Sequence, residues 1–213
     1  MTKVFFNVGM SLDGYIAPEG MDLKYGDDPA YKDWGALWGK LQAWVFEQRF
    51  FRQNLHLGAG GATGRDNELL EETFTRTGVS IMGKRMFDLG EGMWPEEAPF
   101  HTPVFVLTSQ VRDPWVRPGG TTFYFVNDGI ESALHQARAL AGDRDIRIAG
   151  GAEAIQRYLR AGLVDEFTLA TSPVMFGGGP RLFAGIGRDV GVELVETIAS
   201  PRVTHVRYAV RKP

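Results

Sequence analysis

The sequence predicts an α/β protein with a mostly parallel central sheet flanked by helices and a C-terminal antiparallel hairpin. Short apolar runs of strand length alternate with segments of helical periodicity, a rhythm that is typical of parallel sheets with helical crossovers. Residues 192–198 and 203–210 instead alternate with period 2 across Ser200-Pro201, which predicts a hairpin at a sheet edge. With 213 residues and 44% hydrophobic side chains, the chain is long enough to bury a sizeable core.

The first elements are a strand over residues 3–10 and a long amphipathic helix from Pro29 to about Arg52. The Asp13-Gly14 pair after the strand indicates a tight turn. Apolar side chains recur at helical spacing in the helix, and the aromatic ones form core, a dimer interface, or one wall of a pocket for a planar substrate. These aromatic residues are Trp34, Trp38 and Trp44.

The next segment is glycine-rich, over residues 57–64, and is interpreted either as a linker or as an active-site lid. Asp66 is expected to cap a second helix, and Gly78 to end it before a strand over 79–82. The rhythm then continues with strands at 103–107, 122–126, 146–149 and 166–171, and with helices at 130–140 and 153–161. No repeat or linker divides the chain, so we expect one domain over 1–213.

Composition narrows the class of protein. The 26 acidic and 23 basic side chains leave a net charge of −3 without a basic run, which argues against nucleic acid as a partner. No cysteine is present, no signal-like N-terminus is seen, and no apolar run approaches the roughly 18 residues that a membrane span needs. We therefore expect a cytoplasmic protein without a membrane partner. The four histidines lack metal-site spacing, so no metal is expected.

The segment Ile146–Leu159 is the most informative one, because a short apolar strand runs through paired glycines into an amphipathic helix. Glycines allow backbone to approach a ligand closely, and the first N–H groups of a helix favour an anion. The segment lacks the G-x-G-x-x-G spacing of a Rossmann site. A junction that needs small residues only for packing is the alternative.

Two further strand ends carry groups suited to a nucleotide. Lys84 and Arg85 follow one predicted strand, and Thr108 and Ser109 follow another. Because ligands of open parallel sheets bind at the carboxyl ends of strands, we expect these groups to converge with Gly150-Gly151. Taken alone, these features are more typical of a solvated Lys-Arg pair, a capping Thr-Ser pair and a glycine pair needed for packing, but their coincidence at three strand ends favours a nucleotide site.

Five motifs resemble the dihydrofolate reductase superfamily, and most closely the C-terminal reductase domain of the bifunctional riboflavin-biosynthesis deaminase-reductase. The resemblance covers nearly the whole chain, except for an apparent insertion around residues 18–66. It rests on Ser11-Leu12-Asp13-Gly14-Tyr15-Ile16-Ala17, Met82-Gly83-Lys84-Arg85, Leu107-Thr108-Ser109, Ala149-Gly150-Gly151-Ala152 and Gly162-Leu163-Val164-Asp165-Glu166.

The resemblance implies a dihydrofolate reductase-like fold, NADPH as cofactor and hydride transfer to a small heterocycle. The substrate would be similar to 5-amino-6-(5-phosphoribosylamino)uracil or to a pterin, and no deaminase activity is expected. The implied cofactor contacts are Gly9 and Ala17 at the nicotinamide end, Gly83, Lys84, Arg85 and Met86 at the phosphates, Thr108 and Ser109 beside the adenosine, and Gly150, Gly151, Ala152, Glu153, Ala154 and Ile155 around the pyrophosphate. The resemblance also implies a cis peptide bond between Gly150 and Gly151 and a homodimer.

Substrate contacts are less clearly indicated. Asp13 is the candidate catalytic residue, for substrate binding or proton handling, although an Asp-Gly pair also simply makes a good turn. Ile148 stands where the riboflavin enzymes carry an acidic substrate contact. The carboxylate on the first helix of dihydrofolate reductases has three candidates, Asp28, Asp33 and Glu47. A non-catalytic nucleotide- or flavin-binding protein of the same fold is therefore the alternative function.

Overall fold

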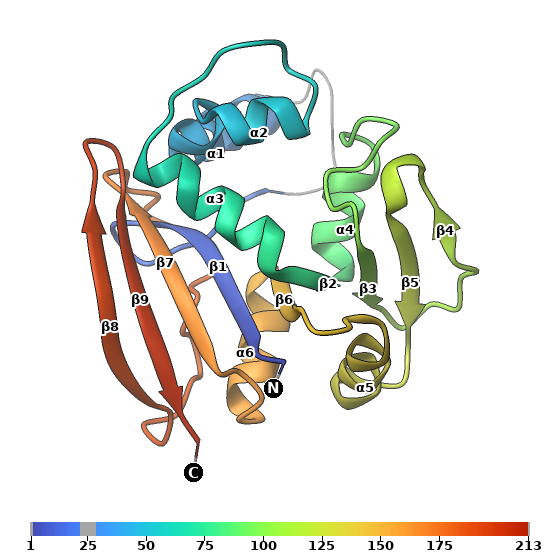
Figure 1. Ribbon diagram of the computed structural model, residues 1–213. Coiled ribbons are helices and arrows are strands. Elements are labelled where there is room, and N and C mark those ends of the chain that lie inside the picture. Colours follow the sequence, from blue (N-terminus) through green and yellow to red (C-terminus); the bar gives the residue numbers. More distant parts are fainter. Residues whose placement is uncertain (1, 22–28, 213) are drawn as a thin grey trace.

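The computed structural model describes residues 2–21 and 29–212, which form a twisted nine-stranded sheet with helices on both faces (Figure 1). The strand order is β4-β5-β3-β2-β6-β1-β7-β9-β8. The strands are β1 (Val4–Ser11), β2 (Thr77–Gly83), β3 (Pro103–Leu107), β4 (Trp115–Val116), β5 (Thr122–Val126), β6 (Asp145–Gly150), β7 (Glu166–Ser172), β8 (Gly191–Ala199) and β9 (Thr204–Arg211).

The centre of the sheet is parallel and its two edges are antiparallel. Strands β5, β3, β2, β6, β1 and β7 all pair in parallel. At one edge β4 pairs with β5 antiparallel, and at the other β9 and β8 form the C-terminal hairpin next to β7. The predicted α/β class, the mostly parallel sheet and the hairpin are confirmed.

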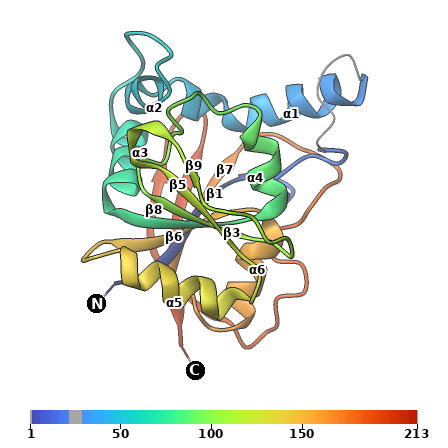
Figure 2. The same ribbon diagram turned by 90° about the vertical axis from the view of Figure 1, so that its right-hand side faces the viewer.

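The helices divide between the two faces of the sheet, as the turned view makes clear (Figure 2). Helices α5 and α6 cover one face, and the remaining helices lie on the other. The helices are α1 (Pro29–Phe46), α2 (Arg49–Asn54), α3 (Arg65–Arg76), α4 (Lys84–Glu91), α5 (Ile130–Leu140) and α6 (Ala152–Arg160), with a short 3-10 turn at Pro118–Gly120.

The main core lies under α5 and α6. In β6, Ile146 and Ile148 are fully buried against these helices, and the period-2 alternation turns Arg147 to the opposite face. The hydroxyl of Tyr158 on α6 donates a buried hydrogen bond to the carbonyl of Ile130 on α5, 2.8 Å away. Because α6 is anchored in this way, the position of its N-terminus beside the end of β6 is well defined.

The opposite face carries a second, aromatic cluster under α4. The fully buried ring of Phe87 packs edge-on against Phe123 at 5.2 Å and against Trp94 at 5.9 Å. Trp94 also stacks on Phe123 at 5.2 Å, so it anchors the loop that follows α4. These contacts hold α4 directly after Gly83, at the carboxyl end of β2.

Three local predictions were wrong. The predicted helix from Pro29 to Arg52 is broken into α1 and α2, with Gln48 in extended conformation at the N-terminus of α2. Gly64, and not Asp66, occupies the N-cap of α3, and Asp66 instead binds His205. Gly78 lies inside β2, where a Cβ would meet the carbonyl oxygen of Ala141 at 2.5 Å, so close approach of the chain explains the glycine.

Two elements, α4 and β4, were not predicted. Helix α4 has only eight residues, and its stabilisation comes from the burial of Phe87 rather than from a long apolar stripe. Strand β4 is a two-residue edge strand. Among the described residues, no helix is both long enough and apolar enough to cross a membrane.

Candidate functional site

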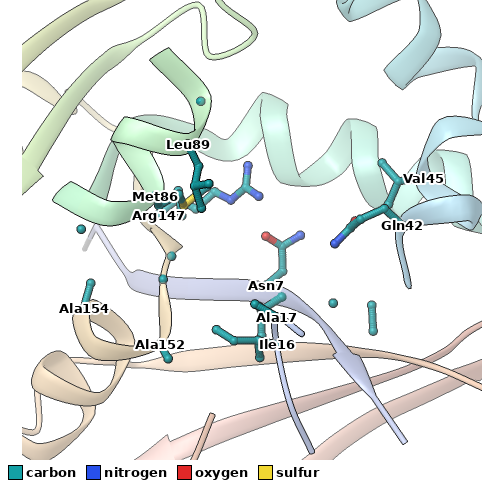
Figure 3. Close-up of a pocket in the computed structure, with 18 of the residues that line it drawn as sticks. Asn7, Ile16, Ala17, Gln42, Val45, Met86, Leu89, Arg147, Ala152 and Ala154 are labelled. Carbon is teal, nitrogen blue, oxygen red and sulfur yellow. The ribbon is translucent and has the colours of Figure 1, made fainter. Parts of the chain in front are cut away.

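A large cavity lies on the α3 and α4 face of the sheet, at the carboxyl ends of β2, β3 and β6 (Figure 3). Its volume is about 1460 Å³. Ligand pockets for single drug-sized molecules are typically ~300–1,000 Å³, so this cavity has room for a dinucleotide together with a small substrate. The predicted convergence of three strand ends is observed, because Gly83, Ser109 and Gly150 all line it.

Backbone dominates the wall at the end of β6. The peptide bond between Gly150 and Gly151 is cis, as the resemblance implied. Gly150 has a φ of 136°, and a Cβ there would lie 2.9 Å from the Sδ of Met86. A Cβ on Gly151 would meet nothing within 4 Å. Helix α6 begins directly afterwards at Ala152, so its first free N–H groups lie beside this glycine pair.

Most of the other predicted cofactor residues also line the cavity. They are Gly9, Ala17, Gly83, Lys84, Arg85, Met86, Thr108, Ser109, Gly150, Gly151, Ala152, Glu153 and Ala154. Ile155 does not line it, because its side chain is fully buried in the core under α6. Gly9 has a packing reason as well, since a Cβ there would lie 3.1 Å from the Nε2 of Gln42 on α1.

The two predicted phosphate-binding cations differ in their surroundings. The ammonium of Lys84 forms an ion pair with Asp88, one turn further along α4. The guanidinium of Arg85 is exposed and donates to the carbonyl oxygen of Met21 at 2.5 Å. Among the residues that the structure describes, Arg85 pairs with no carboxylate, whereas Lys84 pairs with Asp88.

Asp13 does not line the cavity. Its carboxylate accepts hydrogen bonds from the Ser11 hydroxyl at 2.6 Å and from the backbone N–H groups of Phe176 and Gly177 at 3.1 and 2.7 Å. The bond from Ser11, with those from the two backbone groups, lowers the pKa of Asp13 to about 2. The structure thus uses Asp13 to fasten the loop after β7 to the end of β1, and its catalytic role stays a prediction.

Aromatic side chains of α1 form another wall. Trp34 and Trp44 are 5% and 6% exposed, and both line the cavity together with Trp38. The core and pocket-wall interpretations both hold, because Trp44 also belongs to a buried apolar cluster. Of the three candidate carboxylates, Asp28 lies outside the described residues and Asp33 is exposed. Glu47 forms an ion pair with Arg202, away from the cavity lining.

The floor of the cavity holds polar residues that sequence patterns did not identify. Arg147 of β6 and Asn7 of β1 point to the face of the sheet opposite α5 and α6, and both line the cavity. Asn7 donates from its Nδ2 to the hydroxyl of Thr73 at 3.0 Å. A single polar side chain with apolar neighbours on both sides in a strand is the sequence signal that marks them.

His205 of β9 is a third such residue, and it is the histidine that lines the cavity. Its Nε2 lies 3.0 Å from the Oδ1 of Asp66, and its ring packs edge-on against Trp44 at 4.8 Å. Burial lowers the pKa of His205, against the opposing effect of Asp66. Within the described ranges 2–21 and 29–212, no group of three histidine, aspartate or glutamate side chains is arranged to hold a metal.

The sheet order, the C-terminal hairpin and the cavity at the strand ends define a dihydrofolate reductase-like α/β protein. The model of the RibD C-terminal domain family matches residues 2–206, so the chain belongs to that family. An uncharacterised protein of Bacillus subtilis (strain 168), YyaP, is 36% identical over 73 residues, which are 34% of this chain and 38% of that protein.

Two solved structures show the same fold. A putative riboflavin biosynthesis protein from Shewanella sp. PV-4 superposes with a TM-score of 0.65 at 19% identity, over 99% of both chains. Dihydrofolate reductase from Enterococcus faecalis, in complex with NADP(H) and RAB-propyl, has a TM-score of 0.55 at 15% identity, over 98% of this chain and 96% of that chain. At these identities the likeness concerns the fold.

Proposed function

We propose that this protein is an NADPH-dependent reductase that transfers hydride to a small heterocyclic substrate. The observation that carries the proposal is the arrangement at the cavity edge, where three parallel strand ends, the cis Gly150–Gly151 bond and the N-terminus of α6 adjoin one space. Membership of the RibD C-terminal domain family and the fold shared with dihydrofolate reductase support it.

The residues present fit a dinucleotide. Gly83 and Gly151 leave backbone uncovered, because a Cβ on Gly83 would have no heavy atom nearer than 3.7 Å and one on Gly151 none within 4 Å. The N-terminus of α6, nine residues long, offers free N–H groups and the positive end of its dipole to a pyrophosphate. When bound, NADPH supplies the hydride.

The side chains around this backbone would contact the remaining parts of NADPH, which are the adenosine, the 2′-phosphate and the nicotinamide. Thr108 and Ser109 offer hydroxyl groups at the end of β3, beside the adenosine. Arg85 offers a planar fork of donors that suits the 2′-phosphate. The small residues Gly9 and Ala17 leave space at the nicotinamide end, and the tryptophans of α1 exclude water from it.

His205 is the proposed proton-handling group. In the sheet register Gly9 lies opposite Ala170, which in turn lies opposite His205, so two strand spacings, or roughly 10 Å, separate His205 from the nicotinamide end. A substrate placed between them would contact both. Asp66 fixes the histidine ring through its hydrogen bond to Nε2.

Fluorescence titration of the purified protein with NADPH and NADH tests the cofactor. We expect Arg85→Ala to weaken the binding of NADPH at least about tenfold and to change the binding of NADH little, because NADH lacks the 2′-phosphate. Arg138→Ala, an exposed arginine of α5 on the opposite face, is the matched control. Absence of NADPH binding to the wild type refutes the proposal, and equal losses for both cofactors refute the role of Arg85.

A non-catalytic nucleotide- or flavin-binding protein is the second candidate function. It is favoured by Ile148, which is fully buried and so places no polar group at the position where the riboflavin enzymes hold their substrate. NADPH oxidation measured across pterin, pyrimidine and quinone substrates separates the two candidates, because specific turnover eliminates a binding-only role.

We further propose a homodimer. The tryptophans Trp34 and Trp44 are buried within one chain, so α1 is a poor candidate for the interface. Strand β8 ends the described sheet and exposes Val192, Leu194 and Val195 by 47%, 65% and 50%. Sedimentation velocity tests this, with Leu194→Lys as the variant expected to shift the mass toward that of a monomer.

A further inference from the structure

Arg147 is a charged side chain of the cavity lining that has no hydrogen-bonding or ionic partner within residues 2–21 and 29–212. It lies in β6, which is flanked by β1 and β2, so no sheet edge gives it a sideways route to solvent. No hydrogen bond or ion pair joins it to another described residue, and its Nε is buried without an acceptor. Its guanidinium packs over the ring of Phe74 on α3, 5.2 Å from the ring centroid.

The neighbouring carboxylates do not neutralise the positive charge of Arg147. Asp145 and Glu166 lie outside the cavity lining, and both pair with Arg76, at 2.6 and 2.7 Å. The acidic side chains of the lining mostly have cations of their own. Glu72 pairs with Arg65, Asp88 with Lys84 and Glu196 with Arg207, while Glu153 is exposed at the start of α6.

Arg147 remains a cation at neutral pH. Burial lowers its pKa to about 10, which still leaves the guanidinium protonated. An unpaired charge in such an environment is costly to folding, so a replacement by an apolar side chain of similar length would stabilise the protein. The energetic cost is accounted for if a ligand supplies the missing anion.

The geometry shows where that anion would lie. Figure 3 shows the guanidinium beside Met86 and Leu89, on the side of the cavity that Asn7 also faces. Arg147 lies three residues before Gly150, or roughly 10 Å along the strand, so it is displaced from the phosphate-binding edge toward the floor. The buried Oδ1 of Asn7 also lacks a partner and can accept a hydrogen bond from an N–H or O–H group.

We propose that Arg147 is the anion-binding residue of the substrate site, and that the substrate carries a carboxylate or phosphate next to a hydrogen-bond donor that meets Asn7. The identification of the bound anion as a substrate rests on the proposed reductase function. The presence of an anion-binding site at Arg147 does not depend on that function. A planar guanidinium binds either oxyanion with two parallel hydrogen bonds.

Calorimetric titration with three small aromatic probes tests the proposal. The probes are 4-aminobenzoate, phenyl phosphate and the neutral 4-aminobenzamide. We expect one or both anions to bind the wild type more tightly than the amide does. Arg147→Met should weaken the binding of that anion roughly tenfold to hundredfold and leave the binding of the amide unchanged. The anion that loses more affinity identifies carboxylate or phosphate as the natural group.

Thermal unfolding of the same variants excludes a merely structural role. Arg147→Met is expected to melt at the same temperature as the wild type or higher, whereas loss of a structural arginine would lower it. Arg147→Lys, which keeps the charge without the planar fork, should bind the anions with intermediate affinity and gives a second variant should the first not fold. Arg138→Met on the opposite face should change neither property.

Several outcomes overturn the proposal. They are equal anion binding by wild type and Arg147→Met, no anion binding by the wild type at millimolar concentration, or a lowered melting temperature with binding unchanged. NADPH titrated in parallel separates this from the proposed function. Arg147-dependent anion binding without NADPH binding refutes the reductase alone, and NADPH binding with Arg147-independent anion binding refutes the anion site alone.

Discussion

Arg76 lines the same cavity as Arg147, but its replacement should have the opposite effect on stability. Its guanidinium donates to Asp145 at 2.6 and 2.8 Å and to Glu166 at 2.7 Å, and it packs over the ring of Phe5 at 4.0 Å. The side chains of Arg76, Asp145 and Glu166 are 31%, 19% and 13% exposed. The network is therefore enclosed, although water still reaches it.

The magnitude follows from this partial burial. Exposed ion pairs contribute ~0.2–1 kcal/mol, and removing one partner of a fully buried pair costs ~3–5 kcal/mol. Arg76→Met removes the cation from two carboxylates, one of which keeps Lys3, so we expect a loss of about 2–3 kcal/mol. For a chain of this size, that loss lowers the melting temperature by roughly 4–12 °C.

The loss should also depend on pH. Burial alone would raise the pKa of Glu166, but the hydrogen bonds from Lys3 and Arg76 outweigh it and hold the pKa below the ordinary value of 4.5. A carboxyl whose folded pKa is lowered adds stability above its unfolded pKa, and that stability is lost as the pH falls. The difference between wild type and Arg76→Met should therefore shrink below about pH 4.5.

Urea unfolding followed by far-UV circular dichroism, near neutral pH and again in acid, measures both effects. Arg138→Met controls for loss of an exposed arginine and should change the free energy of unfolding by less than about 0.5 kcal/mol. A loss below about 1 kcal/mol for Arg76→Met, or one that is equal at both pH values, would refute the reasoning.

Three further predictions concern the fold around the site. Asp13→Asn should reduce the acid sensitivity of the protein, because the lowered pKa of about 2 gives stability that is present above the unfolded value and lost as the pH falls toward 2. Acid titrations of the two proteins that superimpose would contradict it. Phe87→Ala should cost about 3–5 kcal/mol in chemical denaturation, because the ring is fully buried, and a loss under about 1.5 kcal/mol would be incompatible with that packing. Gly78→Ala should destabilise, since its Cβ would meet a carbonyl oxygen at 2.5 Å, whereas Gly39→Ala on α1 has open space and should stabilise by up to ~1 kcal/mol in the same assay. Free energies of unfolding that shift in the same direction would show that one of these two assignments is wrong.

The edge of the cavity at which we propose that the cofactor binds was largely predictable. Gly83, Ser109 and Gly150 follow parallel strands, and the carboxyl ends of such strands meet at one edge whatever the details of packing. The bounds of β3, β5 and α5 agree with the sequence pattern because each is a continuous apolar or periodic run. The break between α1 and α2 was not predictable, since the apolar stripe continues across it.

The substrate side depended on tertiary contacts. Whether a charged residue is free or paired is decided by partners far away in the sequence, as when Arg76 meets an aspartate 69 residues further on. Lys84 and Arg85 are adjacent and chemically similar, but Lys84 pairs with Asp88 and Arg85 donates to the backbone carbonyl of Met21. Asp13 was singled out for chemistry, and it fastens a loop 163 residues away.

The sequence by itself therefore determined the fold class, the family resemblance and the edge at which a nucleotide would bind. Local periodicity and glycine placement are sufficient for these, because they act over neighbouring residues. Only the tertiary structure decided which charges lie in the cavity without a partner. Arg147 is an ordinary arginine in the sequence, and it becomes a candidate anion site because the assembled sheet and helices enclose much of it and no carboxylate of the described residues pairs with it.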